Sequence, residues 1–236
     1  RLVPGQLMPT GRGWLAAAVV AVIVALGAVL TITGVFGGGD PATPPAAAAP
    51  SPTADPTGSV CGLTDVALSG TVDQAPADAQ WVLVGTIAAP SVPGQGPGLV
   101  DDDGFRSCFA HTPTGAVVAA ANLAALGSYP PVRARFNEQA LAPGAGRDAV
   151  LAKPAAQGAS DGPRLELVGF ALLRYTGQQA DVDLALRTST GSLLAATVYL
   201  AWAEGDWKAR VADDGSDLSS VSPISSLDAY LPWSAE

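Results

Sequence analysis

The fold is decided by the stretch LELVGFALLRYTGQQADVDLALRTSTGSLLAATVYLAWAEGDWKARVA, residues 165–212. Its apolar runs are separated by short turns that each contain a glycine, which is the pattern of consecutive antiparallel strands. The stretch predicts four strands, at residues 165–175, 179–187, 193–202 and 207–212. Because the connecting turns are short, each strand should pair with the next and form a meander.

Side chains alternate along these strands, so each strand should have an apolar and a polar face. Positions 182, 184 and 186 are apolar, whereas Asp181 and Asp183 point to the opposite face. In the last strand, the same alternation predicts that Trp207 points inward and Lys208 outward. The inward positions are mostly Leu, Val and Ala, which indicates a packed interior rather than a catalytic one.

Helices are expected before the meander. Thr112 is a good N-cap and Pro113 suits the first helical turn, so a helix is predicted from there to Leu126, with Gly127 as its C′ residue. Residues 131–141 and 146–153 favour two further helices. Helices followed by an antiparallel meander are typical of the α+β class, with the helices packed on a curved antiparallel sheet.

Two flanking segments complete the predicted domain. Residues 81–88, WVLVGTIA, form a short apolar run and predict one buried strand. Residues 213–226 are polar and predict a loop. The large apolar side chains that follow it, up to Trp233, predict that the tail docks on the domain.

A second feature of the sequence concerns location. The 23 residues from Trp14 to Phe36 carry no charge and would span about 34 Å as a helix, against a hydrocarbon core of about 30 Å. A cleaved signal peptide has a shorter apolar region, and a buried core helix is rarely apolar on every face. An uncleaved membrane anchor is therefore the preferred interpretation, with the other two left open.

The anchor divides the chain into four parts. Residues 1–13 form a cytoplasmic stub, 14–36 the transmembrane helix, 37–59 a linker with six prolines that should stay disordered, and 60–236 an extracytoplasmic domain. Basic residues precede the anchor, and none follows until Arg106. By the positive-inside rule the N-terminus is cytoplasmic and the C-terminal domain extracellular. The sequence starts at an arginine, which indicates a fragment or a processed form.

The charge balance limits the possible partners. The formal net charge is −9, and no cluster of Lys or Arg offsets it. Because an acidic surface is repelled by phosphate backbones, direct nucleic-acid binding is not expected.

The two cysteines, Cys61 and Cys108, are the only ones in the chain. In an extracytoplasmic domain such a pair predicts one disulfide. A metal pair or free thiols are the alternatives. Cys108 lies three residues before His111, the only histidine, so a metal site would have few further ligands.

Common catalytic and metal-binding motifs are absent from the sequence. The sequence has no GxSxG, Walker loop, HExxH or paired-cysteine zinc spacing. Asp101, Asp102 and Asp103 are adjacent rather than alternating, so a solvated acidic turn is favoured over a calcium loop. His111 could act as a base, but a loop or capping role is favoured. No catalytic, cofactor-binding or metal-binding residue is predicted, and no enzyme activity or cofactor is expected.

The order of elements supports one resemblance. The helix pair at residues 113–141, the long strands and the closing hairpin WAEGDWKARV (residues 202–211) resemble the nuclear-transport-factor-two-like cone fold. The resemblance implies a curved meander wrapped around the helices, with an apolar interior. The segment that contains the cysteine pair is additional to that pattern.

A narrower resemblance covers residues 60–236. The segments CGLTDVALSG, WVLVGTIAAP, GDWKARVADDGS and YLPWSAE resemble an uncharacterised actinobacterial family of single-anchor membrane proteins associated with conjugative elements. The build also resembles the bitopic scaffold subunits of type IV secretion and conjugation machines. It implies a non-enzymatic assembly role with other protein subunits, possible homo-oligomers, and a membrane tether. The alternative is an extracytoplasmic domain that binds a small ligand or lipid in an open cone.

Overall fold

The structure is a computed structural model that describes residues 58–153 and 163–235. These residues all belong to one unit of the chain, residues 52–236. Within the described ranges, no helix is both long and apolar enough to cross a membrane. The predicted stub, the anchor from Trp14 to Phe36 and nearly all of the linker lie outside the described residues.

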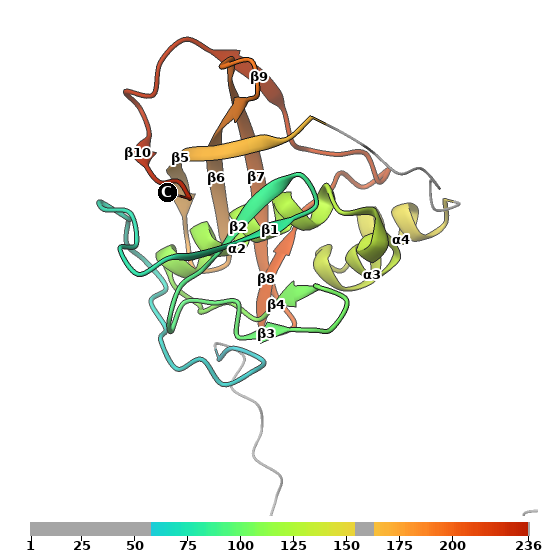
Figure 1. Cartoon of the computed structure of the whole chain (residues 1–236). Coiled ribbons are helices and arrows are strands. Elements are labelled where there is room, and N and C mark those ends of the chain that lie inside the picture. Colours follow the sequence, from blue (N-terminus) through green and yellow to red (C-terminus); the bar gives the residue numbers. More distant parts are fainter. Residues whose placement is uncertain (1–57, 154–162, 236) are drawn as a thin grey trace, which may run out of the picture. The chain divides into compact units, whose positions relative to one another are not determined.

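The predicted meander is confirmed. Strands β5 (Leu165–Tyr175), β6 (Gln179–Thr188), β7 (Leu193–Ala203) and β8 (Asp206–Ala209) follow one another, and each pairs antiparallel with the next. The polar turns between them are short, so neighbouring strands close directly into hairpins. The sheet curls strongly into a half-barrel (Figure 1).

The prediction of one buried strand at residues 81–88 is wrong. This segment forms a hairpin of β1 (Gln80–Val84) and β2 (Ile87–Ser91). Gly85 has a φ of 59°, a left-handed conformation that favours glycine and turns the chain inside the apolar run. The hairpin extends the sheet, because β2 pairs parallel to the start of β5 at Ile87 and Leu165. Hydrophobicity alone did not distinguish one strand from two short ones.

The C-terminal segment contributes two short strands. The predicted loop at residues 213–226 contains β9 (Val221–Ile224), which pairs with β7. The docking of the tail is confirmed, since β10 (Leu231–Pro232) pairs with β5 and Trp233 is buried. The described sheet therefore runs β1-β2-β5-β6-β7-β8, with β10 beside β5 and β9 beside β7. A separate pair is formed by β3 (Leu99–Val100) and β4 (Arg106–Ser107).

Helix α2 (Pro113–Gly127) starts as predicted. The Thr112 hydroxyl accepts a hydrogen bond from the Gly115 backbone N–H at 2.8 Å, and Pro113 occupies the first turn. The predicted C′ role of Gly127 is wrong, because Gly127 is the last helical residue and Ser128 is the C-cap with a φ of −86°. The Ser128 N–H and hydroxyl both donate to the Ala125 carbonyl, so no left-handed residue is needed there.

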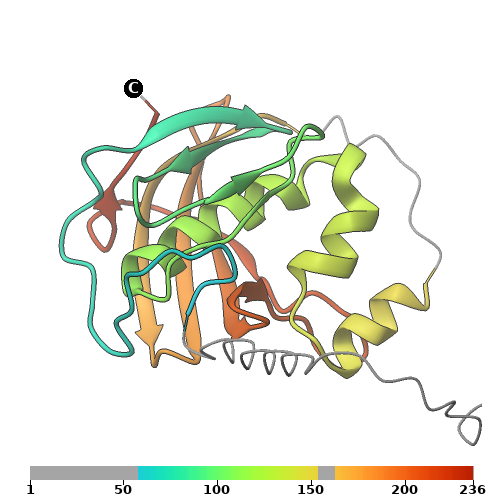
Figure 2. The same ribbon diagram turned by 90° about the horizontal axis from the view of Figure 1, so that it is seen from below.

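Helix α2 lies across the concave side of the sheet, and the later helical segments lie beyond its end (Figure 2). Nearly all its side chains are buried, which explains why the helix is apolar on every face. Its alanines allow a close approach to the strands, while Leu123 and Leu126 fill the hydrophobic core together with Phe170, Leu184 and Leu200.

The second predicted helix is present as three short turns rather than one α-helix. Residues Pro130–Val132 form a 3-10 turn, Arg133–Arg135 an α turn (α3), and Phe136–Ala140 a π turn. Helix α4 (Ala145–Leu151) corresponds to the third predicted helix. The π turn packs against β8, and α4 packs against the π turn. Residues of the π turn and of α4 line a groove beside β8.

Candidate functional site

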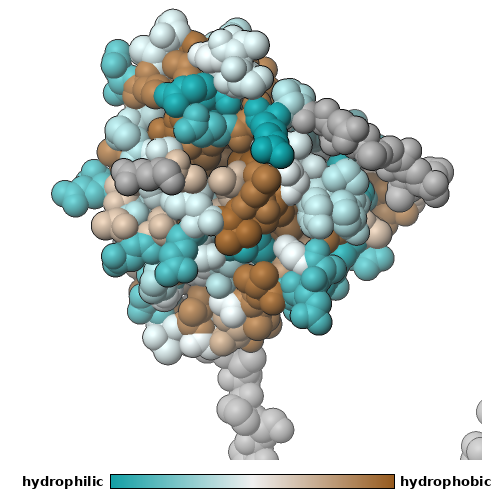
Figure 3. Space-filling model, viewed as in Figure 1, coloured by the Kyte–Doolittle hydropathy of each residue, from teal (hydrophilic) through white to brown (hydrophobic). Residues whose placement is uncertain are grey.

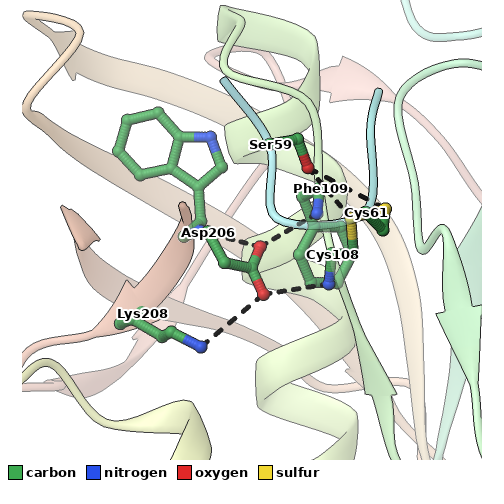
Figure 4. The surroundings of a disulfide bond; sticks show 7 residues. Ser59, Cys61, Cys108, Phe109, Asp206 and Lys208 are labelled. Carbon is green, nitrogen blue, oxygen red and sulfur yellow. Dashed lines mark hydrogen bonds and ion pairs between the residues drawn. A yellow bond between two sulfur atoms is a disulfide. The ribbon is translucent and has the colours of Figure 1, made fainter. Parts of the chain in front are cut away.

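The disulfide predicted from the cysteine pair is confirmed. Cys61 and Cys108 are joined with their Cα atoms 6.0 Å apart. The Ser59 hydroxyl lies 2.9 Å from the Cys108 sulfur, and the Val60 N–H donates to the Gly205 carbonyl at 2.8 Å. The first described residues are therefore held against the β7–β8 turn (Figure 4).

The carboxylate of Asp206 lies directly beside this disulfide. Asp206 is only 2% exposed. One oxygen accepts from the Cys108 N–H, and the other accepts from the N–H groups of Phe109 and Trp207, each at 2.9 Å. Asp206, the first residue of β8, thus binds backbone N–H groups of the disulfide segment with both oxygens of its carboxylate (Figure 4).

Lys208 completes the cluster. It lies on the face of β8 opposite Trp207, as the alternation predicts, but the expectation that it faces solvent is wrong. It is 9% exposed, and its ammonium lies 3.7 Å from the Asp206 carboxylate. The ammonium also donates to the Gln139 carbonyl at 2.8 Å. The π turn that ends at Ala140 covers this face of β8, which strand alternation could not reveal. Lys208 therefore links that turn to the strand.

Burial raises the pKa of Asp206 above the ordinary aspartate value, while the nearby Lys208 ammonium and the three N–H donors lower it and offset part of the rise. Both carboxylate oxygens are already occupied by backbone donors. The geometry is that of a carboxylate that fixes local structure.

A groove of about 550 Å³ has Asp206 and Lys208 among its lining residues. The ion pair between Arg147 and Glu204, 3.5 Å apart, lies on its wall. The lining mixes apolar and charged groups and includes Val60, Phe105, Leu151, Glu138, Arg147, Asp148, Glu204, Asp206 and Lys208. Four carboxylate and two cationic side chains line the groove, so it has a net negative charge, as the whole chain does.

His111 is part of the core, so the predicted loop or capping role is wrong. Its side chain is fully buried, and its Nε2 lies 2.5 Å from the Gly177 carbonyl. The ring stacks on Trp202 with centroids 3.8 Å apart and an interplanar angle of 5°, and Trp207 meets it edge-on. A single histidine in a loop sequence gave no indication of this packing.

The three adjacent aspartates form an exposed turn, as predicted. Asp101 and Asp103 both pair with Arg135, whose guanidinium also lies over the Phe105 ring at 4.3 Å. A backbone hydrogen bond from Phe105, together with Arg135, holds the pKa of Asp103 below its usual value. The turn is therefore held by an arginine from the second helical segment.

Sequence reasoning missed a buried polar network between β2, β4 and α2. The Arg106 Nε donates to the Asn122 side chain at 2.6 Å, and a second guanidinium nitrogen donates to the Ser91 hydroxyl. The Asn122 amide donates to the carbonyls of Pro90 and Val118, both at 2.8 Å. An asparagine in the middle of an alanine-rich helix was the available signal, because a buried amide needs partners.

The β1 edge of the sheet exposes large hydrophobic side chains. Among the described residues, β1 pairs only with β2, so its other edge is unpaired. Its sequence QWVLV has no charge and no proline, and Val82 and Leu83 are each 54% exposed. Hydrophobic residues gather over this hairpin and again over β3 (Figure 3).

A second groove, of about 490 Å³, starts at β1 and ends at the C-terminal strand. Trp81 and Trp233 meet edge-to-face in it, with centroids 5.0 Å apart. Its lining carries no charged side chain and consists of Pro76, Ala77, Ala79, Trp81, Pro232, Trp233 and Ser234.

Residues 40–232 of the sequence match a protein family described as a domain of unknown function (DUF8175). The chain belongs to this family. No curated protein and no solved structure matches the sequence at a significant level. The DUF8175 match includes the disulfide, the Asp206–Lys208 cluster and β1, and it ends within β10 at Pro232.

Proposed function

We propose that this DUF8175 protein is a non-enzymatic, membrane-tethered assembly subunit of a conjugative transfer or secretion apparatus. In this proposal, residues 14–36 anchor the chain, the N-terminus is cytoplasmic, and the domain described above acts outside the cell membrane. The domain then functions through protein–protein contacts. The resemblance to single-anchor proteins of conjugative elements supports the setting, and the β1 edge supports the mode of contact.

The single observation that carries the proposal is the unprotected edge of β1. Exposed edge strands normally carry a charge, a proline or a bulge that prevents pairing with another chain. In a chain with a net charge of −9, the strand QWVLV has none of these, and two of its five residues are large, apolar and half-exposed. Such an edge favours the addition of a further strand.

A second copy of the chain is the partner that fits this edge. If two β1 strands pair antiparallel about a two-fold axis through Val82, Trp81 of each copy faces Leu83 of the other. An aromatic residue opposite an aliphatic one is a favourable cross-strand pair, and no like charges meet. A symmetric interface of this type is the commonest in homo-oligomers. The contact is small, so attachment of both copies to one membrane, with its high effective concentration, would strengthen it.

The filling of the half-barrel also supports an assembly role over the alternative of a ligand-binding cone. Helix α2 occupies the concave side of the sheet, and its residues Val117, Val118 and Leu126 are fully or almost fully buried against the strands. The two grooves described above, one beside Asp206 and Lys208 and one between β1 and β10, both lie outside this interior.

Cysteine crosslinking of the full chain in its native membrane tests the proposed interface. Directly opposite residues in an antiparallel pair have Cα atoms about 4.5–5.5 Å apart, within the range of a disulfide. We expect V82C to form a covalent dimer under mild oxidation. The matched control is V221C, because Val221 is a valine with 64% exposure in a short strand, β9, that carries a protecting proline.

A charge substitution at the same two positions provides the complementary test. V82K should shift the native full chain from dimer to monomer in detergent, whereas V221K should leave the dimer intact. Deletion of the gene should lower conjugation frequency, and V82K should lower it without reducing the amount of protein in the membrane. A monomeric wild-type chain, or a dimer equally stable in V82K, would overturn the proposed interface. Unchanged conjugation after deletion would overturn the proposed apparatus.

A further inference from the structure

The buried arginine of β4 has no anionic partner within the described part of the chain. Arg106 is only 4% exposed, and the ion pairs of the described residues do not include it. It donates to three neutral groups, the Asn122 side chain, the Ser91 hydroxyl and the Pro90 carbonyl. Burial lowers the pKa of Arg106, but an arginine in a protein keeps its charge. Because buried charges are normally paired, this cation favours the binding of an anion nearby.

Ser91 connects the buried cation to the surface. A terminal nitrogen of Arg106 donates to the Ser91 hydroxyl oxygen, so the hydroxyl hydrogen is directed away from the guanidinium. A hydroxyl has one donor and two acceptor sites, and the Ser91 O–H donates to no other described residue. Ser91 is partly exposed and lines a groove of about 230 Å³. A ligand in this groove can therefore accept from a hydroxyl that is polarised by the arginine behind it.

Gln80 supplies further donors beside that hydroxyl. Gln80 and Ser91 are directly opposite each other in the β1–β2 hairpin, so their side chains lie on the same face. Gln80 is exposed, lines the same groove, and its side-chain amide bonds to no other described residue. The amide NH₂ group carries two donors. The groove thus presents neutral donors from two strands in front of one buried cation.

The rest of the groove determines which anion fits. Besides Gln80 and Ser91, its lining consists of glycine, proline, leucine and valine residues and includes no charged side chain. Asp65, whose carboxylate accepts from the Gln95 amide at 3.0 Å, is not one of the lining residues. Apolar walls strengthen the attraction between the cation and an anion. A carboxylate matches the single positive charge, and its two oxygens can accept from Ser91 and Gln80 together.

We propose that the groove at Gln80 and Ser91 binds a small monovalent carboxylate, with the buried guanidinium of Arg106 as its counter-charge. The carboxylate belongs either to a free small molecule or to the C-terminus of a polypeptide, since both present the same group. The site goes beyond the proposed pairing of β1 strands, because it uses side chains of the hairpin and of β4 rather than the free backbone edge.

The test titrates sodium acetate into the full chain in detergent micelles, with the ionic strength held constant by sodium sulfate. Acetamide, which has the same shape and no charge, is the matched control ligand. One readout is the nuclear magnetic resonance signal of the Gln80 side-chain amide. The second is the rise of the free energy of unfolding with acetate, which measures binding to the folded state in every variant.

We expect the Gln80 signal to move to saturation with acetate and to stay unmoved with acetamide. R106Q should bind acetate about tenfold more weakly or worse, because it lacks the counter-charge. Q80E should show a similar loss, since it adds a negative charge, and its exposed position should leave the fold intact. The control R187Q should bind like wild type, because Arg187 is an exposed residue paired with Glu166 on β5. N-acetylalanine resembles a polypeptide C-terminus, so tighter binding than acetate would identify that source, and equal or weaker binding a free small molecule.

Three results would overturn the proposal. The first is a Gln80 signal that does not move at high acetate. The second is an equal response to acetate and acetamide, which would show that charge is not recognised. The third is wild-type affinity for acetate in R106Q, or in Q80E if R106Q does not fold.

Discussion

Replacing Asp206 by asparagine should destabilise the domain by about 4 kcal/mol. In the native structure, the two carboxylate oxygens accept three backbone N–H groups at 2.9 Å. Asparagine has only one acceptor oxygen. If that oxygen keeps Phe109 and Trp207, its NH₂ group faces the Cys108 N–H, and two donors then meet in a buried site.

The magnitude follows from two terms. A buried donor left without an acceptor costs about 1–3 kcal/mol. Removing one partner of a buried ion pair costs about 3–5 kcal/mol, but Lys208 retains the Gln139 carbonyl at 2.8 Å and its ammonium lies a rather long 3.7 Å from Asp206. The ion-pair term should therefore be at the lower end of its range or below it, which gives the total of about 4 kcal/mol.

The assay is urea unfolding of the full chain, followed by tryptophan fluorescence with the disulfide intact. Trp207 is adjacent to the substituted residue and fully buried, so its emission should report the transition. D102N is the matched control, because Asp102 lies in the exposed turn, and it should change the free energy of unfolding by less than about 0.5 kcal/mol. A D206N protein within 1 kcal/mol of wild type would refute the assigned role of this carboxylate.

Four further variants test other parts of the structure. G115A should destabilise strongly, by about 3 kcal/mol or more, because its Cβ would overlap a backbone carbonyl of the preceding loop. G127A has open space around its Cβ and should stabilise the domain by about 0.5–1 kcal/mol. Denaturant midpoints measure the effects of both glycine variants. Burial, together with a hydrogen bond to an aspartate, raises the pKa of Tyr230 to about 12. The folded state holds the Tyr230 proton more tightly than the unfolded state, so the protonated hydroxyl stabilises the fold. This stabilisation is complete below pH about 10, the ordinary pKa of tyrosine, and is lost as the pH rises through about 12. Y230F should reduce that alkaline loss and remove one late tyrosinate from an absorbance titration. A C61S/C108S double variant should lose about 4 kcal/mol in denaturant, because the disulfide closes a long loop, and an unchanged midpoint would contradict this.

The sequence was most informative where a structure depends on local chemistry. Strands β5 to β7 follow directly from alternation and short turns, since both signals act between residues that are close in the chain. The start of α2 was equally clear, because the N-cap and proline positions are local features. The cysteine pair was predictable because the chain has no third cysteine to compete for pairing.

Where the sequence misled, distant segments decided the outcome. The alternation of β8 is correct, but the π turn from residues 136–140 covers its polar face and buries Lys208. His111 is buried because Trp202 and Trp207 come from strands 91 and 96 residues later in the chain. Arg106 and Asn122 form a network only because β4, β2 and α2 converge.

By itself, then, the sequence determined the α+β class, the meander, the helix start and the disulfide, since each depends on periodicity, capping or pairing within short reach. Only the tertiary structure decided which polar groups are buried, which strand forms the free edge and which groups surround Arg106. The physical reason is that burial is a property of what packs against a residue. Packing partners far away in the chain leave no periodic signal in the local sequence.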